Sequence, residues 1–233
     1  MKKKKLHIYL DGLPLEDIKK YKKKVDGFTF NPSLFKSLGV KNYLDFTKKV
    51  AKAAYPKSVS IEVIGDDENT IFFQAKKLAK IYDNIFVKIP ITYTNGKSTF
   101  RLIKKLNDEN IKLNITAIFT LKQIKKIFPI VRNKKHILSV FSGRIFDIGI
   151  DAEKKFKDIS FFLKSKNSKC KLLWASSRMV YDVFFAQKSN ADIITIPLSI
   201  FKKQKLFKMK PEKYSLETVK TFYNDAVKAK FKI

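Results

Sequence analysis

Cysteine and histidine are scarce in this sequence, which narrows the chemistry open to it. A single cysteine, Cys170, excludes an internal disulfide. The two histidines, His7 and His136, lie far apart in the sequence and match no familiar metal-ligand spacing. We therefore expect any catalysis to proceed without a metal ion or another cofactor, with carboxylate-bound Mg²⁺ as the alternative.

Long apolar runs and flexible linkers are also missing. No apolar stretch approaches the roughly 20 residues that a membrane-spanning helix requires. The opening "MKKKKLHIYLDGLP" has only a short apolar segment after its lysines, unlike a secretory signal. No stretch rich in proline, glycine and serine divides the 233 residues. These absences predict a single cytoplasmic domain over residues 1–233 that does not enter a membrane.

Acidic residues are few relative to basic ones. The chain has 21 aspartates and glutamates against 50 lysines and arginines, a formal net charge of +29. Such a charge attracts nucleic acid and phosphorylated metabolites alike. The lysines are spread along the chain in runs such as "KKYKKK" and "KKQKLFK", on what read as solvated helix faces. Biased composition therefore explains them better than a dedicated nucleic-acid surface does.

Short β-branched apolar runs are abundant, and they alternate with amphipathic segments. Val50, Ala51 and Ala54, for example, fall on one face of an expected helix. Strands that alternate with helices build a parallel sheet, and eight such units fit a closed (β/α)₈ barrel better than an open doubly wound sheet, the alternative. A terminal helix is expected over residues 214–230, with Ser215 as its N-cap. The eight apolar runs cover residues 6–11, 27–31, 59–65, 85–90, 112–119, 136–142, 170–177 and 192–198.

Seven of these runs carry a polar side chain, mostly near the carboxyl end. The active sites of (β/α)₈ barrels lie at that end of the strands. Taken singly, each polar group could be a helix cap or a satisfied core residue, but seven strands in succession predict a site. The residues are Asp11, Asn31, Glu62, Lys88, Asn114, Thr116, Ser139 and Ser176.

Lys88 is the most informative of these residues because it interrupts the apolar run "NIFVKIPIT". Burial disfavours the charged ammonium form of lysine, and the neutral amine attacks carbonyl groups to form a Schiff base. Glu62 and Thr116, if they face the barrel axis, could position a water molecule for the proton transfers of that reaction. The alternatives for Lys88 are a surface lysine whose amine reaches solvent and a buried ion pair with Glu62.

Arginine is rare, since only four of the 50 basic residues are arginines. Its planar fork of donors suits phosphate. Arg144 and Arg178 directly follow the sixth and seventh runs, in "FSGRIFD" and "WASSRMV". Ser176 and Ser177 precede an expected helix start, where backbone N–H groups would add to anion binding. The pattern predicts a phosphate site, with a surface ion pair as the alternative for each arginine.

Several motifs in succession resemble one known family. The segments "GFTFNPSL", "VSIEV", "IFVKIPIT", "LNITAIF", "SVFSGRIFDIG" and "LLWASSR" are similar to the consecutive signature blocks of transaldolases and the related fructose-6-phosphate aldolases. The segment "IYLDGLPLEDIKKY" is similar to their opening strand and helix. The resemblance covers nearly the whole chain. It implies a class I aldolase-type (β/α)₈ enzyme that acts on sugar phosphates without a cofactor or metal.

The resemblance also implies a role for each candidate residue. Lys88 would form the Schiff base, and Glu62 and Thr116 would handle the catalytic water. Asp11 would serve the proton transfer at the cleaving C3–C4 bond. The dihydroxyacetone hydroxyls would be held by Asn31, Asn114 and Ser139. The substrate phosphate would be held by Arg144, Ser176 and Arg178.

Glu62 and Phe141 distinguish the two branches of the family. The aldolases have glutamine and tyrosine at these positions, whereas this chain resembles the transaldolases. The resemblance therefore implies transfer of a dihydroxyacetone unit from fructose 6-phosphate or sedoheptulose 7-phosphate to an aldose phosphate. A fructose-6-phosphate aldolase, or a transaldolase-like enzyme for another sugar, is the alternative. A non-catalytic basic barrel that binds nucleic acid is a more distant one.

The length of the chain resembles one branch of the family, and two of its residues depart from the family pattern. The short chain and "TVKTFYNDA" resemble the small-transaldolase branch, whose pentameric rings pair into decamers, so the terminal helix is expected to pack on a neighbouring subunit. Phe30 stands where the family usually has threonine, and Gly12 where it has threonine or serine. Phe30 could alter the sugar accepted, or it could only pack.

Overall fold

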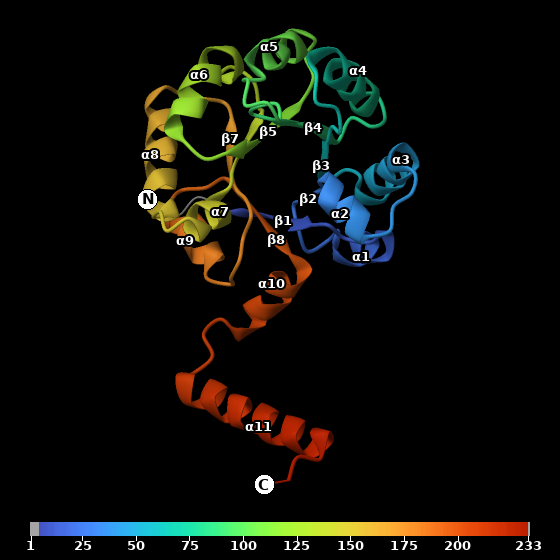
Figure 1. The fold of residues 1–233 in the computed structure, drawn as a ribbon. Coiled ribbons are helices and arrows are strands. Elements are labelled where there is room, and N and C mark those ends of the chain that lie inside the picture. The colour runs from blue at the N-terminus through green and yellow to red at the C-terminus, as the bar shows by residue number, and fades with distance from the viewer. Residues whose placement is uncertain (1–4, 233) are drawn as a thin grey trace. The chain divides into compact units, whose positions relative to one another are not determined.

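The fold is a closed barrel of eight parallel strands surrounded by helices (Figure 1). The computed structural model describes residues 5–232. Each strand pairs with the next along the chain, and the last pairs with the first, so the predicted (β/α)₈ barrel is confirmed and the open sheet is excluded. The strands are β1 (His7–Asp11), β2 (Gly27–Thr29), β3 (Ser58–Glu62), β4 (Ile85–Pro90), β5 (Leu113–Ile118), β6 (Ile137–Val140), β7 (Lys171–Trp174) and β8 (Ile193–Pro197).

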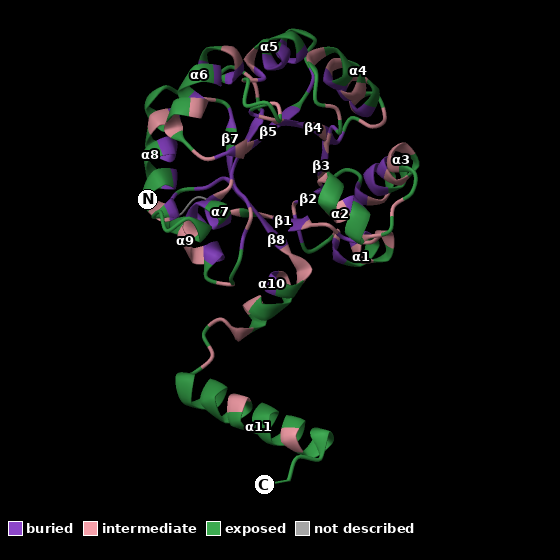
Figure 2. Ribbon diagram, viewed as in Figure 1, coloured by how far each residue is buried: buried purple, intermediate pink, exposed green. Residues whose placement is uncertain are grey.

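Burial on both faces explains why these segments read as near-continuous apolar runs. Helices cover the outside of the barrel and side chains fill its inside, so a strand has no solvated face. In β8, Ile193, Ile194 and Ile196 are at most 3% exposed, and Figure 2 shows buried residues in all the labelled strands. Seven of the eight predicted runs contain one strand of the barrel each, and the third, 59–65, overlaps β3, which begins one residue earlier.

Helices follow the strands in sequence and bury one face each. In α3, Val50, Ala51 and Ala54 are fully buried, as predicted, and Asn42 caps the helix by accepting a hydrogen bond from the Asp45 N–H at 2.9 Å. Within residues 5–232, no helix is both long and apolar enough to cross a membrane. The helices up to residue 203 are α1 (Leu15–Tyr21), α2 (Pro32–Ser37), α3 (Tyr43–Ala54), α4 (Glu68–Ala79), α5 (Phe100–Asp108), α6 (Leu121–Val131), α7 (Ser142–Asp147), α8 (Ala152–Ser165), α9 (Asp182–Lys188) and α10 (Leu198–Lys203).

Apolar side chains inside the barrel form a layer below the polar strand ends. Tyr9, Ile137 and Leu173 pack in one buried cluster. A Cβ atom at Gly27 would lie 2.7 Å from the Tyr9 ring, so only glycine leaves room for that ring. Asp11 lies two residues beyond Tyr9 on the same face of β1, because side chains alternate along a strand. The polar residues at the strand ends therefore lie above a layer of packed apolar side chains.

The chain divides into two compact units, Met1–Phe201 and Lys202–Ile233. The second unit contains a 3₁₀ turn, η1 (Gln204–Leu206), and α11 (Pro211–Ala229). No residue of α11 is buried (Figure 2). The expected packing of this helix on a neighbouring subunit stays a prediction.

The terminal helix begins earlier than predicted. Ser215 lies inside α11 and is not its N-cap, which is Lys210. Pro211 takes the first helical position, where its fixed φ suits the helix and its missing N–H leaves no donor unpaired. The prediction of Ser215 was wrong because this proline starts the helix one turn before the serine.

Candidate active site

A polar pocket of about 180 Å³ lies at the carboxyl ends of the barrel strands. It is lined by all the predicted site residues except Glu62. These are Asp11, Asn31, Lys88, Asn114, Thr116, Ser139, Phe141, Arg144, Ser176 and Arg178. Ser177, named above with Ser176 for the expected anion site, also lines it, as do four residues that were not selected from the sequence, namely Thr29, Ala175, Thr195 and Pro197.

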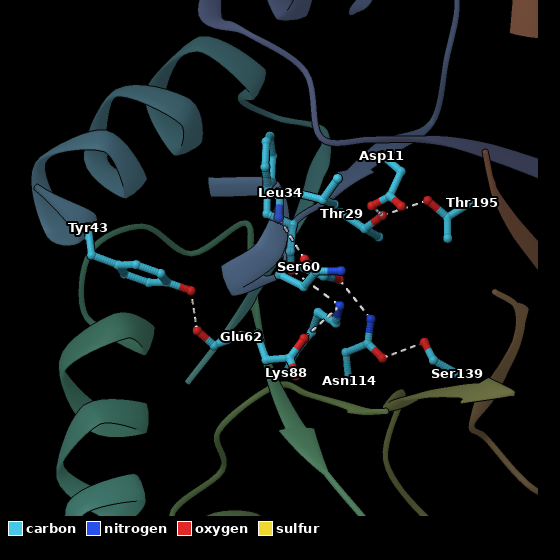
Figure 3. A network of polar contacts seen from close by, with 12 residues as sticks. Asp11, Thr29, Leu34, Tyr43, Ser60, Glu62, Lys88, Asn114, Ser139 and Thr195 are labelled. Atoms are coloured by element: carbon cyan, nitrogen blue, oxygen red, sulfur yellow. Dashed lines mark hydrogen bonds and ion pairs between the residues drawn. The ribbon is translucent and has the colours of Figure 1, made fainter. Parts of the chain in front are cut away.

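Lys88 lies at the bottom of this pocket and is 6% exposed. Its Nζ atom is 3.0 Å from Glu62 Oε2 and donates a hydrogen bond to the Phe30 carbonyl at 3.2 Å (Figure 3). Glu62 and Lys88 are register partners on β3 and β4, which explains why their side chains meet. Of the two alternatives, the surface lysine is wrong, whereas the buried ion pair is present. An ion pair does not exclude Schiff-base chemistry, because the carboxylate can accept the proton that the amine must lose.

Phe30, the departure from the family pattern, does not face the pocket. Its side chain is fully buried and packs edge to face on Phe35 and Phe46, with ring centroids 5.5 and 6.4 Å away. Its contribution to the site is the backbone carbonyl that Lys88 contacts. Of the two expectations for Phe30, the structure supports packing.

Gly12, the second departure, has a conformational reason. Its φ is +65°, in the left-handed region, and a Cβ atom there would lie 2.6 Å from Leu34 Cδ2. The Gly12 N–H donates to the Thr29 carbonyl at 3.0 Å, which extends the pairing of β1 with β2, and the positive φ then turns the chain. A threonine or serine would strain this turn.

Asp11 is held by hydroxyl groups. The Thr29 hydroxyl donates to Asp11 Oδ1 at 2.8 Å, and Thr29 Oγ1 is 2.5 Å from Thr195 Oγ1 (Figure 3). Burial raises the pKa of the Asp11 carboxyl above its usual range, while the Lys88 charge and the Thr29 hydrogen bond oppose that shift. A carboxyl with a raised pKa is a stronger base than an ordinary carboxylate, which suits it to take up a proton.

Two asparagines are fixed by the fold. Asn114 on β5 donates from Nδ2 to Ser60 Oγ at 3.0 Å and accepts from the Ser139 hydroxyl at 2.6 Å, so it links three strands. Asn31 caps α2 by accepting a hydrogen bond from the Leu34 N–H at 2.9 Å. Its side-chain NH₂ group therefore remains as the donor toward the pocket.

Thr116 presents an unused hydroxyl. Its Oγ1 atom is buried and has no hydrogen-bond partner among the described residues. The next residue, Ala117, has φ +56° at the irregularity in the pairing of β5 with β6. Backbone strain and an unpartnered buried hydroxyl are both costly, and such features concentrate at functional sites.

Arg144 and Arg178 form the basic side of the pocket, and both are largely exposed. The Arg144 guanidinium lies 5.6 Å from the centre of the Phe141 ring. Arg178 Nη2 is 2.6 Å from Asp147 Oδ2, so the ion pair considered as the alternative for Arg178 is present. A phosphate in the pocket would share this guanidinium with Asp147 or displace the carboxylate.

The expected helix start after Ser177 is wrong. Helix α9 begins at Asp182, and the N–H groups of Arg178 and Met179 donate to Asp182 Oδ2 at 2.7 and 2.9 Å. Trp174 Nε1 donates to the other oxygen at 3.1 Å, which accounts for the complete burial of Asp182. These backbone groups are therefore not available to an anion, contrary to expectation.

Both histidines contact other residues of the protein. Buried His136 accepts a hydrogen bond from the Leu113 N–H at 3.2 Å, and its other ring nitrogen is 3.0 Å from Asn107 Oδ1. Burial lowers the pKa of His136 to about 4, which keeps the ring neutral. His7 contacts Asp26. Among the described residues there is no cluster of three or more histidine, cysteine, aspartate and glutamate side chains that could hold a metal ion.

The chain resembles known proteins in sequence and in fold. The family model described as "Transaldolase/Fructose-6-phosphate aldolase" matches residues 8–233. A probable transaldolase of Shouchella clausii is 36% identical over 180 residues, which cover 76% of this chain and 78% of the relative. A probable transaldolase of Nitrosopumilus maritimus is 33% identical over 203 residues, or 85% and 86% of the two chains. The crystal structure of dihydrodipicolinate synthase from Rhodopseudomonas palustris has a TM-score of 0.55 at 12% identity, covers 95% of this chain and 79% of that one, and supports the fold alone.

Proposed function

The chain belongs to the transaldolase/fructose-6-phosphate aldolase family, and from this premise we propose that it is a transaldolase. It would transfer a dihydroxyacetone unit from a ketose phosphate, such as fructose 6-phosphate or sedoheptulose 7-phosphate, to an aldose phosphate. The observation that carries the proposal is the contact of Lys88, a buried lysine that lines the polar pocket, with Glu62 at 3.0 Å.

Schiff-base formation begins with loss of a proton from Lys88. Glu62 Oε2 is the adjacent acceptor, so the amine can become neutral without a proton reaching bulk solvent. The amine attacks the ketose C2 carbonyl, and the resulting carbinolamine loses water to give an iminium ion. The unpartnered hydroxyl of Thr116 supports a second role, because together with Glu62 it could hold that water molecule.

Cleavage of the C3–C4 bond needs a base at the C4 hydroxyl. We assign this role to Asp11, whose raised pKa suits both uptake and return of the proton. As the hydroxyl proton moves to Asp11, the C3–C4 bond breaks, the aldehyde leaves, and the bonding electrons form a C2=C3 bond that neutralises the iminium nitrogen. The enamine that remains on Lys88 then attacks the acceptor aldehyde, and Asp11 returns the proton.

Substrate binding is assigned to the remaining pocket residues. The dihydroxyacetone hydroxyls would be held by Asn31, Asn114 and Ser139, since each lines the pocket with a polar side chain. Arg144, Ser176 and Arg178 would hold the phosphate on the basic side. We place the activity in the cytoplasm.

Dependence on an acceptor separates a transaldolase from a fructose-6-phosphate aldolase. With fructose 6-phosphate alone, we expect no sustained release of glyceraldehyde 3-phosphate, because the enamine stays on Lys88. Addition of an aldose phosphate such as erythrose 4-phosphate should restore turnover and yield a new ketose phosphate. A coupled assay of glyceraldehyde 3-phosphate measures both conditions. Sustained release without an acceptor would instead identify an aldolase, and no release with either would contradict the proposed substrate.

We further propose that the protein is a homo-oligomer, a pentamer or decamer, in which α11 packs on a neighbouring subunit. The supporting observation is that several apolar side chains of this helix are more than half exposed. Multi-angle light scattering should give a mass several times 27.1 kDa. A chain truncated after residue 209 should give a smaller species, and a monomeric full-length chain would refute the proposal. The side chains are Tyr214, Leu216, Val219, Phe222, Tyr223 and Val227.

A further inference from the structure

Two threonine hydroxyls form a chain that ends on Asp11. Thr29 on β2 and Thr195 on β8 are 3% and 6% exposed, and their hydroxyl oxygens are 2.5 Å apart. Strands β2 and β8 pair with β1 from opposite sides, with Thr29 and Pro197 as the register partners of Asp11. The hydrogen bonds of the described residues connect Thr195 to Asp11 through Thr29 (Figure 3).

The direction of this chain follows from a count of hydrogens. A threonine hydroxyl has one hydrogen, and that of Thr29 is donated to Asp11 Oδ1 at 2.8 Å. The short contact between the two threonines must then be a hydrogen bond donated by Thr195. The order is Thr195 to Thr29 to Asp11, and it ends on one of the two carboxylate oxygens.

The backbone of Thr195 is held as well. Its carbonyl accepts a hydrogen bond from the Ser177 hydroxyl at 2.9 Å, and Ser177 follows β7 beside the pocket. Thr195 therefore sits between the carboxylate of Asp11 and the loop that carries Arg178. Both hydroxyls of the chain line the pocket, so they act within the site and not behind it.

We propose that Thr195 is a positioning residue for Asp11, acting through Thr29 to reserve Oδ2 for the proton of the substrate hydroxyl. Oδ1 is occupied by the hydrogen bond from Thr29, whereas Oδ2 accepts no hydrogen bond from the described residues. When Oδ2 takes the proton, Oδ1 keeps its donor, so the carboxyl plane stays fixed through cleavage and transfer. The inference rests on the proposed function for its kinetic consequences.

Loss of the Thr195 hydroxyl has a defined effect on pH dependence. Thr29 would still donate to Asp11, but its hydroxyl would no longer be polarised by a donor of its own, and the hydrogen bond would weaken. Because that bond lowers the pKa of Asp11, the pKa should rise, and Asp11 should require a higher pH to act as a base. The charged groups that act on Asp11 are Lys88 and Glu62, and neither is changed by the substitution.

The test compares Thr195→Val, which keeps the branched shape, with Thr195→Ser, which keeps the hydroxyl. We expect Thr195→Val to lower kcat about tenfold with KM changed less than about twofold, and to move the acid limb of the kcat/KM profile to higher pH. Thr195→Ser should restore most of the rate. Thr47→Val is the matched control, because it removes an equally buried threonine hydroxyl, bonded to the Tyr43 carbonyl. It should leave the profile unchanged.

A double-mutant cycle tests the chain itself. Thr29→Val should have at least the effect of Thr195→Val, and the double variant should be no worse than Thr29→Val alone, because both changes break the same path. Additive effects, or a Thr195→Val enzyme with the wild-type rate and pH profile, would overturn the inference. If Thr195→Val fails to fold, Thr195→Ala provides the same comparison.

Failure of the inference can be told apart from failure of the proposed function. Schiff-base formation precedes the step assigned to Asp11, so Thr195→Val should still give a borohydride-reduced adduct on Lys88. Absence of an adduct in the wild-type protein would contradict the proposed function alone. In that case ¹³C NMR of the Asp11 side-chain carboxyl carbon still measures its pKa in the wild-type and Thr195→Val proteins. Identical titration curves would overturn the positioning role.

Discussion

Replacement of Lys88 with methionine is expected to lower kcat/KM by about a thousandfold or more and to abolish the borohydride-trapped adduct. Methionine is similar in length and apolar, so it fills the same space without an amine. Incubation with fructose 6-phosphate, reduction and peptide mass spectrometry should show a dihydroxyacetone-sized mass increase on Lys88 of the wild-type protein and none in the variant. An adduct on another lysine, or full activity of the variant, would refute the assignment.

A loss of activity must be separated from a loss of fold. Removal of the amine leaves Glu62, whose side chain is 17% exposed, without its charge partner. Lys88→Met should therefore lose about 2 kcal/mol of the free energy of unfolding, less than for a fully buried pair. The double variant Lys88→Met/Glu62→Gln removes both charges and should regain stability without regaining activity. Lys88→Arg keeps the charge but cannot form the imine, so it should be folded and inactive.

Replacement of Gly143 with alanine is the second change with a large expected effect. A Cβ atom at this position, near the start of α7, would lie 1.6 Å from the Ser176 carbonyl oxygen. Side chains cannot relieve this overlap, because the opposing atom belongs to the backbone. The loop after β7 must shift, although Ser176 is already held at φ +62°. We expect a loss of about 3 kcal/mol or more, seen as a melting temperature lower by roughly 10 °C.

The same shift should affect binding on the basic side of the pocket. If Gly143→Ala folds, KM for phosphorylated donors should rise much more than KM for free dihydroxyacetone, since the loop carries Ser176 and Arg178. Gly149→Ala is the matched control, because it adds a methyl group just after the same helix with nothing within 4 Å. Its φ of +75° should cost about 1 kcal/mol. Equal stability of the two variants would show that the close approach at Gly143 is unimportant.

The strands of this barrel could be predicted from sequence because their environment is uniform. A strand buried on both faces must be apolar throughout, and a polar residue within it then stands out. Lys88 and Glu62 stand out for this reason, and the structure brings them together. The pairing register explains the contact, because polar residues that are register partners on neighbouring strands, such as Glu62 and Lys88, lie side by side in the barrel.

Hydroxyl residues within the strands were harder to recognise. Thr195 and Thr29 were missed because threonine is β-branched and fits an apolar strand as well as valine does. Ser60, which holds Asn114, lies near the start of its run and not at the carboxyl end. A signal did exist for Thr195, because the eighth run was the one for which no polar residue was selected.

Side-chain contacts that the apolar pattern does not reveal account for the other errors. The expected helix start after Ser177 failed because buried Asp182 takes the N–H groups of the loop, and its burial depends on Trp174. Phe30 stood out as a departure beside the site, but only the aromatic cluster with Phe35 and Phe46 shows that it points away from the pocket. The apolar pattern alone indicates neither the direction of a side chain nor the partner of a buried carboxylate.

The pairing of β1 with β8 has a consequence for the newly made chain. In the closed barrel every strand has a neighbour on both sides, so no strand edge is open to pairing with another molecule. During synthesis, however, β1 must wait for the last strand of the barrel, and until then apolar strands rich in isoleucine end in unpaired edges. The time before β8 emerges is therefore when this protein is most prone to aggregate, and its excess of lysines, through mutual repulsion, opposes association in that interval.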